Sequence, residues 1–231
     1  MILQNRTVLI TGAKGGLGTY VTNAFLAAGA TVAGVSRSIQ QSDFDHPRFT
    51  AIPAELGSRD AAETLAAETV ARHGRIDAVV HLLGGFAGGT TVVDSDDATL
   101  DQMFDLNFRS LFHIARAVLP GMRSRHAGAL LAIGSRTVIE PQPGLGLYSA
   151  SKAALVSLMQ TIARENAAHG ITANVILPGT LDTPANRRAM PGADPSKWVQ
   201  PSQIAALLVH LASPRATQLS GAVIPVYGGE L

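Results

Sequence analysis

Short, almost continuously apolar runs alternate with longer helical patterns along the whole chain. Seven such runs are predicted to form strands, at residues 7–10, 31–35, 49–52, 77–82, 129–133, 172–176 and 222–226. Strands that are apolar on both sides are typical of parallel sheets, because helices cover both faces. The helical patterns lie between them, at residues 17–28, 59–72, 100–123, 148–168 and 202–212. The alternation therefore predicts an α/β fold with one doubly wound parallel sheet of about seven strands and helices on both faces.

Composition narrows the class of protein further. A length of 231 residues with 46% apolar side chains suits a single domain, 1–231, with a large core. The net charge of +1 and the absence of a basic block give no indication of a nucleic-acid partner. No cysteine is present, which excludes disulfides and thiolate chemistry, and no metal site is predicted. No apolar run approaches the roughly 20 residues of a membrane span, so we expect a cytoplasmic protein without a membrane partner.

The first predicted strand runs directly into a glycine-rich turn that opens the first helix, Thr11-Gly12-Ala13-Lys14-Gly15-Gly16-Leu17-Gly18. Gly12 permits the tight turn, Gly16 lets the backbone approach a pyrophosphate, and Gly18 lets the helix pack closely on the strand. The helix from Leu17 then presents free N–H groups to the phosphates. Because the turn lacks the Lys-Ser/Thr ending of a P-loop, it favours a Rossmann-type dinucleotide site. Lys14 is expected to touch phosphate or to be a solvated lysine of the turn.

The end of the second predicted strand bears on which dinucleotide binds. An acidic side chain there would hydrogen-bond the ribose 2′-hydroxyl and favour NAD. This chain has Ser36 and Arg37 instead, and a guanidinium can make a charge-assisted contact with a 2′-phosphate. The alternative interpretation is a surface arginine at a strand end. Since the carboxylate is missing, we predict NADP(H) as the cofactor, with NAD(H) as the alternative.

Two residues at the start of the fourth helical pattern are suited to proton transfer. Tyr148 and Lys152 are four residues apart, so both project from one face of the helix. A phenol has a pKa of about 10, which a nearby ammonium lowers by stabilising the phenolate. Ser135 follows the strand 129–133 at the carboxyl edge, where ligands bind in open α/β sheets, and could hold a carbonyl oxygen beside the phenol. Each feature alone is common on solvated surfaces; their combination downstream of the glycine turn favours catalysis.

Together, the glycine turn, Ser135 and the Tyr148–Lys152 pair resemble the short-chain dehydrogenase/reductase family along nearly the whole chain. The resemblance implies that Tyr148 is the general acid/base, that Ser135 polarises the substrate oxygen, and that Lys152 lowers the phenol pKa and binds the nicotinamide ribose. It also implies that Asn107 holds a proton-relay water, although a mid-helix asparagine by itself would indicate only a local solvent contact. Three further residues match the family segment beside the nicotinamide: Pro178, Gly179 and Thr183.

This chain departs from the family pattern at several positions. His81-Leu82-Leu83-Gly84 stands where the family usually has Asn-Asn-Ala-Gly. Gly84 still permits close approach to the cofactor, and we interpret His81 as a structural residue that bonds to neighbouring backbone. Glu55, followed by Leu56, replaces an aspartate near the adenine, and Tyr227 replaces an aspartate close to the C-terminus.

The long segment 179–200 is predicted to be irregular, and long loops in compact domains are usually functional. Residues 181–191 with Trp198, and the glycine-rich stretch 84–89, resemble dihydropteridine reductases. Those enzymes usually lack the serine and carry an acid after the second strand, whereas this chain has Ser135 and Arg37. We therefore expect a lid over cofactor and substrate at about 180–200, with a surface connection as the alternative.

These observations predict an NAD(P)H-dependent oxidoreductase that reduces a carbonyl or oxidises the alcohol by hydride transfer. A dihydropteridine-type reductase is the first alternative and a non-catalytic dinucleotide sensor the second. A methyltransferase would leave the Tyr148–Lys152 pair idle. The resemblance also implies a homodimer or homotetramer formed through the helices at 100–123 and 148–168, each apolar enough to line an interface.

Overall fold

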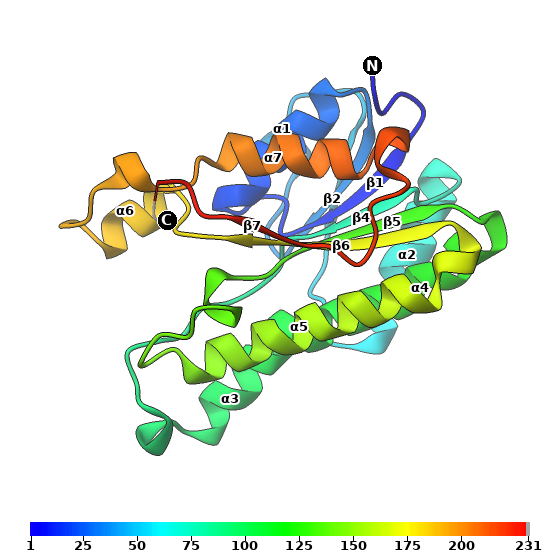
Figure 1. Ribbon diagram of the computed structural model, residues 1–231. Coiled ribbons are helices and arrows are strands. Elements are labelled where there is room, and N and C mark those ends of the chain that lie inside the picture. Colours follow the sequence, from blue (N-terminus) through cyan, green and yellow to red (C-terminus); the bar gives the residue numbers. More distant parts are fainter. Residues whose placement is uncertain (230–231) are drawn as a thin grey trace.

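A seven-stranded sheet forms the centre of the computed structural model, which describes residues 1–229 (Figure 1). The order is β3-β2-β1-β4-β5-β6-β7, and every pairing is parallel. The strands are β1 (Thr7–Thr11), β2 (Thr31–Ser36), β3 (Phe49–Pro53), β4 (Ala78–His81), β5 (Gly128–Ile133), β6 (Ile171–Pro178) and β7 (Val223–Val226). The predicted fold class is therefore confirmed. Residues 230 and 231 of the predicted domain lie outside the described part of the chain.

Helices cover both faces of this sheet (Figure 1). One layer holds α1 (Gly16–Ala27) and α7 (Pro201–Leu211), and the other holds α2 (Arg59–His73), α4 (Ser110–Arg125) and α5 (Gly146–Glu165). Strand β1 shows why its sequence is continuously apolar. Val8 and Ile10 pack into the core beneath α1 and α7, whereas Leu9 packs into the core on the α2, α4 and α5 side. The three central residues of β1 are therefore apolar on both faces, while Thr7 and Thr11 at its ends are buried polar residues.

The switch point of the sheet lies between β1 and β4. The chain builds β2 and β3 on one side of β1 and then returns to place β4 on the other side. The carboxyl ends of the two strands are in register, with Thr11 beside His81. Ligands of open α/β sheets bind outside the strand ends at such a reversal. The fold therefore indicates a candidate ligand site at the loops that follow β1 and β4.

The predicted helix at 100–123 is wrong as a single helix. It consists of α3 (Asp97–Phe104), a π-helical turn (η3, Asp105–Arg109) and α4. In the π turn the N–H of Ser110 bonds to the carbonyl of Asp105, five residues back, so the turn holds one extra residue. The extra residue changes the direction of nearby side chains but leaves the helical apolar pattern recognisable.

The segment 179–200 is also more regular than predicted. It contains α6 (Pro184–Ala189) and a 3₁₀ turn, η6 (Pro195–Lys197). The hydroxyl of Thr183 caps α6 by accepting a hydrogen bond from the N–H of Asn186. The remaining short turns are η1 (Gln41–Asp43), η2 (Val92–Asp94), η4 (Arg136–Val138), η5 (Ala167–His169) and η7 (Pro214–Ala216). No helix within residues 1–229 has the length and apolarity needed to cross a membrane.

Candidate active site

The glycine turn between β1 and α1 is held by close backbone contacts. Gly12 has a φ of +70°, and a Cβ there would lie 3.0 Å from the backbone of Leu82 and Leu83. A Cβ on Gly18 would lie 2.0 Å from the carbonyl oxygen of Gly12, so only glycine lets the helix approach the turn this closely. Gly16 opens α1 opposite Thr183, whose side chain would lie 3.3 Å from an added Cβ. The N-terminus of α1 thus faces the segment after β6 across a narrow backbone cradle.

Lys14 in the glycine turn contacts the segment that follows β2. Its ammonium lies 2.9 Å from the Oδ1 atom of Asp43 and donates to the carbonyl of Ser38. The hydrogen bond from Lys14 lowers the pKa of the Asp43 carboxyl, so this carboxyl is ionised at neutral pH. Lys14 therefore ties the segment after β2 to the glycine turn. Leu17 packs against the core beneath α1.

The end of β2 carries a free hydroxyl beside a cation. The Oγ atom of Ser36 is buried and has no hydrogen-bond partner within the described chain, and Arg37 is exposed next to it. An unpaired buried hydroxyl is costly, which suits a position that a ligand oxygen completes. Glu55 is exposed at the end of the neighbouring strand, whereas the Leu56 side chain belongs to the core. Any contact from Leu56 to a ligand would therefore come from its backbone.

Ser135, Tyr148 and Lys152 come together at the carboxyl edge of β5. Ser135 follows this strand as the cap of η4, and its hydroxyl is hydrogen-bonded to the phenol of Tyr148. Tyr148 and Lys152 lie in the first two turns of α5. The ammonium of Lys152 donates to the carbonyl oxygen of Ile133 at 2.9 Å. Ser135 and Lys152 are buried and Tyr148 is half-buried, so the group is well shielded and fixed in place.

The electrostatics of this group differ from the prediction. Burial raises the pKa of the Tyr148 phenol, and the hydrogen bond with Ser135 opposes that rise. Burial lowers the pKa of Lys152 to about 8. The predicted lowering of the phenol pKa by Lys152 is not seen in this structure, where the ammonium of Lys152 donates to the carbonyl of Ile133. Tyr148 is therefore a protonated phenol at neutral pH, which is the form that donates a proton.

Asn107 lies in the π turn and is completely buried, so a solvent contact is wrong. Its Oδ1 atom accepts from the N–H of Gly85 at 2.9 Å, and its Nδ2 atom donates to the carbonyl of Gly85 and to Ser151. A Cβ on Gly84 would lie 2.7 Å from Oδ1 of Asn107 and 3.1 Å from Nζ of Lys152. The glycine after β4 thus makes room for the polar side chains of the site.

His81 is buried at the end of β4, and its partners differ from the backbone groups predicted. Nδ1 lies 3.0 Å from Oγ1 of Thr11, and Nε2 lies 3.2 Å from Oγ of Ser110. Burial, with a smaller contribution from the charge of Lys152, lowers the pKa of the imidazole to about 3. His81 is therefore neutral at physiological pH, and both of its ring nitrogens are engaged by side-chain hydroxyls.

The segment after β6 completes the edge of the site. Pro178 ends β6, and the N–H of Gly179 bonds to the carbonyl of Val226. Thr183 is buried against Gly16, so it lies beside the cradle. The ring of Tyr227 packs beneath the guanidinium of Arg136, 4.7 Å from its centroid.

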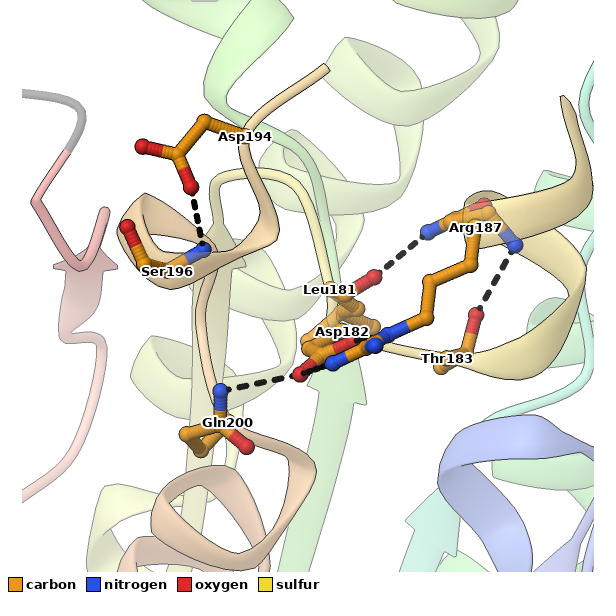
Figure 2. A network of polar contacts seen from close by, with 8 residues as sticks. Leu181, Asp182, Thr183, Arg187, Asp194, Ser196 and Gln200 are labelled. Atoms are coloured by element: carbon orange, nitrogen blue, oxygen red, sulfur yellow. Dashed lines mark hydrogen bonds and ion pairs between the residues drawn. The ribbon is translucent and has the colours of Figure 1, made fainter. Parts of the chain in front are cut away.

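Figure 2 shows a polar network that fixes this segment on the body of the protein. Asp182 accepts two hydrogen bonds from Arg187 in α6 and one from Gln200, which precedes α7. These bonds lower the pKa of Asp182 to about 2. The backbone adds a bridge between Leu181 and Val199. The two ends of the segment are therefore joined, while Met190 between them is exposed.

Phe86 is a residue of this site that the sequence argument did not single out. Its ring is 69% exposed and lies edge-on to the ring of Tyr148, with 5.1 Å between centroids. The loop that carries it is joined to the loop before α5 by a hydrogen bond from Gly89 to Gly144. The sequence feature that could have identified Phe86 is its position as a single aromatic residue among glycines just after a central strand.

The fold and this edge define the chain as a Rossmann-type protein with a glycine-rich backbone cradle beside a buried polar group. Residues 6–193 match the family model described as short chain dehydrogenase. The chain belongs to the short-chain dehydrogenase/reductase family, whose members are oxidoreductases that use nicotinamide dinucleotides. No group of metal-ligating side chains occurs among residues 1–229.

Similar proteins span the same length as this chain. It is 27% identical to the 3-oxoacyl-(acyl-carrier-protein) reductase FabG of Thermotoga maritima, over 99% of both chains. It is 30% identical to the uncharacterized oxidoreductase YmfI of Bacillus subtilis, over 98% of this chain and 99% of that one. A solved structure titled short chain dehydrogenase/reductase family protein superimposes with a TM-score of 0.88 at 29% identity, covering 99% of this chain and 98% of that one. The resemblance of residues 180–200 to dihydropteridine reductases has no counterpart among these findings.

Proposed function

We propose that the protein reduces a carbonyl group, or oxidises the corresponding alcohol, with NADP(H), through Ser135, Tyr148 and Lys152. The observation that carries the proposal is the hydrogen-bonded pair Ser135–Tyr148 beside a buried ammonium at the carboxyl edge of the sheet. The name of the Thermotoga maritima relative, a 3-oxoacyl reductase, supports carbonyl reduction.

The residues of the cradle fit a dinucleotide. The N-terminus of α1 and Gly16 suit a pyrophosphate, and the unpaired hydroxyl of Ser36 with Arg37 suits a ribose 2′-phosphate. Lys14 would shape this region through Asp43. When bound, NADP(H) exchanges a hydride with the substrate carbon.

Side chains of the protein transfer the proton and bind the substrate oxygen. In reduction, the phenol of Tyr148 transfers its proton to the oxygen as the carbonyl becomes an alcohol, and in oxidation the phenolate takes the proton back. Ser135 donates a hydrogen bond to the same oxygen and stabilises developing negative charge. Lys152, held by its hydrogen bond to the carbonyl of Ile133, would donate hydrogen bonds to the nicotinamide ribose. Asn107 fixes the backbone of Gly85 beside this group.

The direct test follows nicotinamide absorbance with a panel of ketones, 3-oxoacyl thioesters and a quinonoid dihydropteridine, each with NADPH and NADH. Turnover of a carbonyl compound with NADPH supports the proposal. Turnover of the quinonoid dihydropteridine alone would favour the dihydropteridine-type alternative. Tight binding of a dinucleotide with no turnover on any compound would favour a sensor.

Arg37→Ala is expected to separate the two cofactors. Loss of a charge-assisted contact with the 2′-phosphate should weaken NADPH binding by roughly 1.5–3 kcal/mol and leave NADH nearly unchanged. Dissociation constants from NADPH and NADH fluorescence titrations measure the effect. Arg215→Ala, an exposed arginine in η7, serves as the matched control. Equal weakening of both cofactors by Arg37→Ala would mean that Arg37 is structural.

The protein is expected to be a homodimer or homotetramer that pairs the helices α4 and α5. Phe112 on α4 is a large apolar side chain that remains 37% exposed, with the guanidinium of Arg116 over its ring. Light scattering of the wild type at micromolar concentration should give a multiple of the chain mass. Phe112→Asp should shift that mass downward. A monomeric wild type would contradict the prediction.

The segment at 180–200 is expected to close over cofactor and substrate. NADP(H) with substrate should slow tryptic cleavage after Arg187 and Arg188, which are exposed in α6. The polar network at Asp182 anchors the two ends, so closure would move α6 and Met190 between them. Replacement of Met190 should then alter substrate preference more than stability. Cleavage at the same rate with and without saturating ligands would leave only a surface connection.

A further inference from the structure

A continuous chain of buried hydrogen bonds crosses the centre of the molecule from the glycine turn to the π turn. The N–H of Leu83 donates to Oγ1 of Thr11, which is bonded to Nδ1 of His81. Nε2 of His81 is bonded to Oγ of Ser110, and that hydroxyl donates to the carbonyl of Leu106 at 2.7 Å. All three polar side chains are at most 1% exposed.

The hydrogen bonds at the two ends of this series determine which atom donates in each bond between them. The hydroxyl of Ser110 uses its only proton on the carbonyl of Leu106, so it must accept from His81. Nε2 of His81 therefore carries the proton, and Nδ1 accepts the proton of the Thr11 hydroxyl. Thr11 in turn accepts from the N–H of Leu83. Every donor and acceptor is satisfied only with a neutral, Nε2-protonated imidazole.

The last link of the chain replaces a backbone bond that the π turn removes. In a regular helix the N–H of Ser110 would bond to the carbonyl of Leu106, but here it bonds to Asp105. The side-chain hydroxyl of Ser110 supplies the donor to Leu106 instead. Asn107 is the next residue of this turn, and it holds both backbone groups of Gly85.

We propose that His81 and Ser110 are positioning residues that hold the π turn open and thereby aim Asn107 at Gly85, Ser151 and the space beside Lys152. The inference rests on the proposed function for the catalytic role of Asn107, but not for the geometry. A histidine reaches both hydroxyls because its two ring nitrogens point in different directions. The histidine at the end of β4 therefore links Thr11 to Ser110 in addition to packing in the core.

The first experiment uses the wild-type protein labelled with ¹⁵N-histidine and does not depend on activity. NMR is expected to show His81 as the neutral Nε2–H tautomer, unchanged between pH 5 and 8. The Nδ1–H tautomer would overturn the proposal, because Ser110 would then donate to Nε2 in place of Leu106. Titration near the ordinary histidine pKa would overturn it too, because the imidazole would not be held in the neutral form in which Nδ1 accepts from Thr11.

The second experiment compares Ser110→Ala with Thr69→Ala. Thr69 is buried in α2, and its hydroxyl donates to Leu65 four residues back, so it loses a similar bond far from the site. In Ser110→Ala the amide of Gly85 should exchange with deuterium at least tenfold faster than in the wild type, and kcat should fall at least tenfold. The dissociation constant for NADP(H) should change less than threefold. Thr69→Ala should leave kcat and Gly85 exchange unchanged.

Ser110→Thr keeps the hydroxyl and should restore most of the activity and the slow exchange at Gly85. Should Ser110→Ala fail to fold, His81→Phe removes the same link from the other side and is expected to give the same pattern. Unchanged Gly85 exchange and kcat in a folded variant would overturn the proposal. If no variant and no wild-type preparation turns over any substrate, the proposed function fails, while the tautomer and the Gly85 exchange still decide this inference.

Discussion

Tyr148→Phe is expected to lower kcat by roughly 10²–10⁴-fold, the usual contribution of a general acid or base. The variant keeps the aromatic ring, and with it the edge-on contact with Phe86, but loses the proton and the hydrogen bond with Ser135. Affinity for NADP(H) should remain close to that of the wild type, because the glycine turn is untouched. Tyr20→Phe, which alters an exposed tyrosine of α1, is the matched control and should keep full turnover.

The same residue predicts the sign of the pH dependence. Burial raises the pKa of the Tyr148 phenol, so the phenolate is the minor form at neutral pH. Alcohol oxidation needs that phenolate and should accelerate as the pH rises towards the phenol pKa, whereas carbonyl reduction needs the phenol and should slow there. Ser135→Ala removes the opposing hydrogen bond and should move both profiles to higher pH. A Tyr148→Phe enzyme with near wild-type kcat would remove Tyr148 from the mechanism.

The sheet and its order of helices could be predicted because burial on both faces leaves a direct record in the sequence. The π turn could not be predicted in that way. One extra residue between α3 and α4 leaves the apolar spacing of the helix largely intact, and only the buried polar pair Asn107 and Ser110 marks the place. The burial of Ser110 is visible only in the structure, since a serine in a helical pattern is ordinary in the sequence until its contact with His81 is known.

The segment at 180–200 shows how a correct rule led to an incomplete prediction. The segment contains Pro184, Pro191 and Pro195, and prolines disrupt helix interiors because they lack an N–H, so a continuous helix is not expected from the sequence. Pro184 occupies the first position of α6, where no N–H is needed, and Thr183 caps the helix in front of it. The ion pair between Lys14 and Asp43 could not be predicted from the sequence for a different reason. Its two residues are distant in sequence, and no local pattern indicates that they are in contact.

Gly18→Ala is expected to have the largest effect on stability and on the cradle together. The added Cβ would lie 2.0 Å from the carbonyl oxygen of Gly12 and 2.8 Å from the carbonyl group of Ala13. These neighbours are backbone atoms of the glycine turn, so no rotation of a side chain relieves the clash. Overpacking of a core usually costs about 1–3 kcal/mol, and a clash with backbone belongs at or above the upper end of that range.

Urea unfolding of Gly18→Ala should therefore show a loss of about 3 kcal/mol or more from the free energy of unfolding, a large share of the roughly 5–15 kcal/mol typical of a folded domain. Gly57→Ala is the matched control, because no atom lies within 4 Å of its added Cβ, and its stability should change by less than about 0.5 kcal/mol. The surviving folded fraction of Gly18→Ala should bind NADP(H) weakly, since α1 must move away from β1 and its N-terminal N–H groups move with it. A variant with the wild-type urea midpoint and cofactor affinity would show that the turn yields easily, and the close packing of α1 would then not explain why glycine occupies this position.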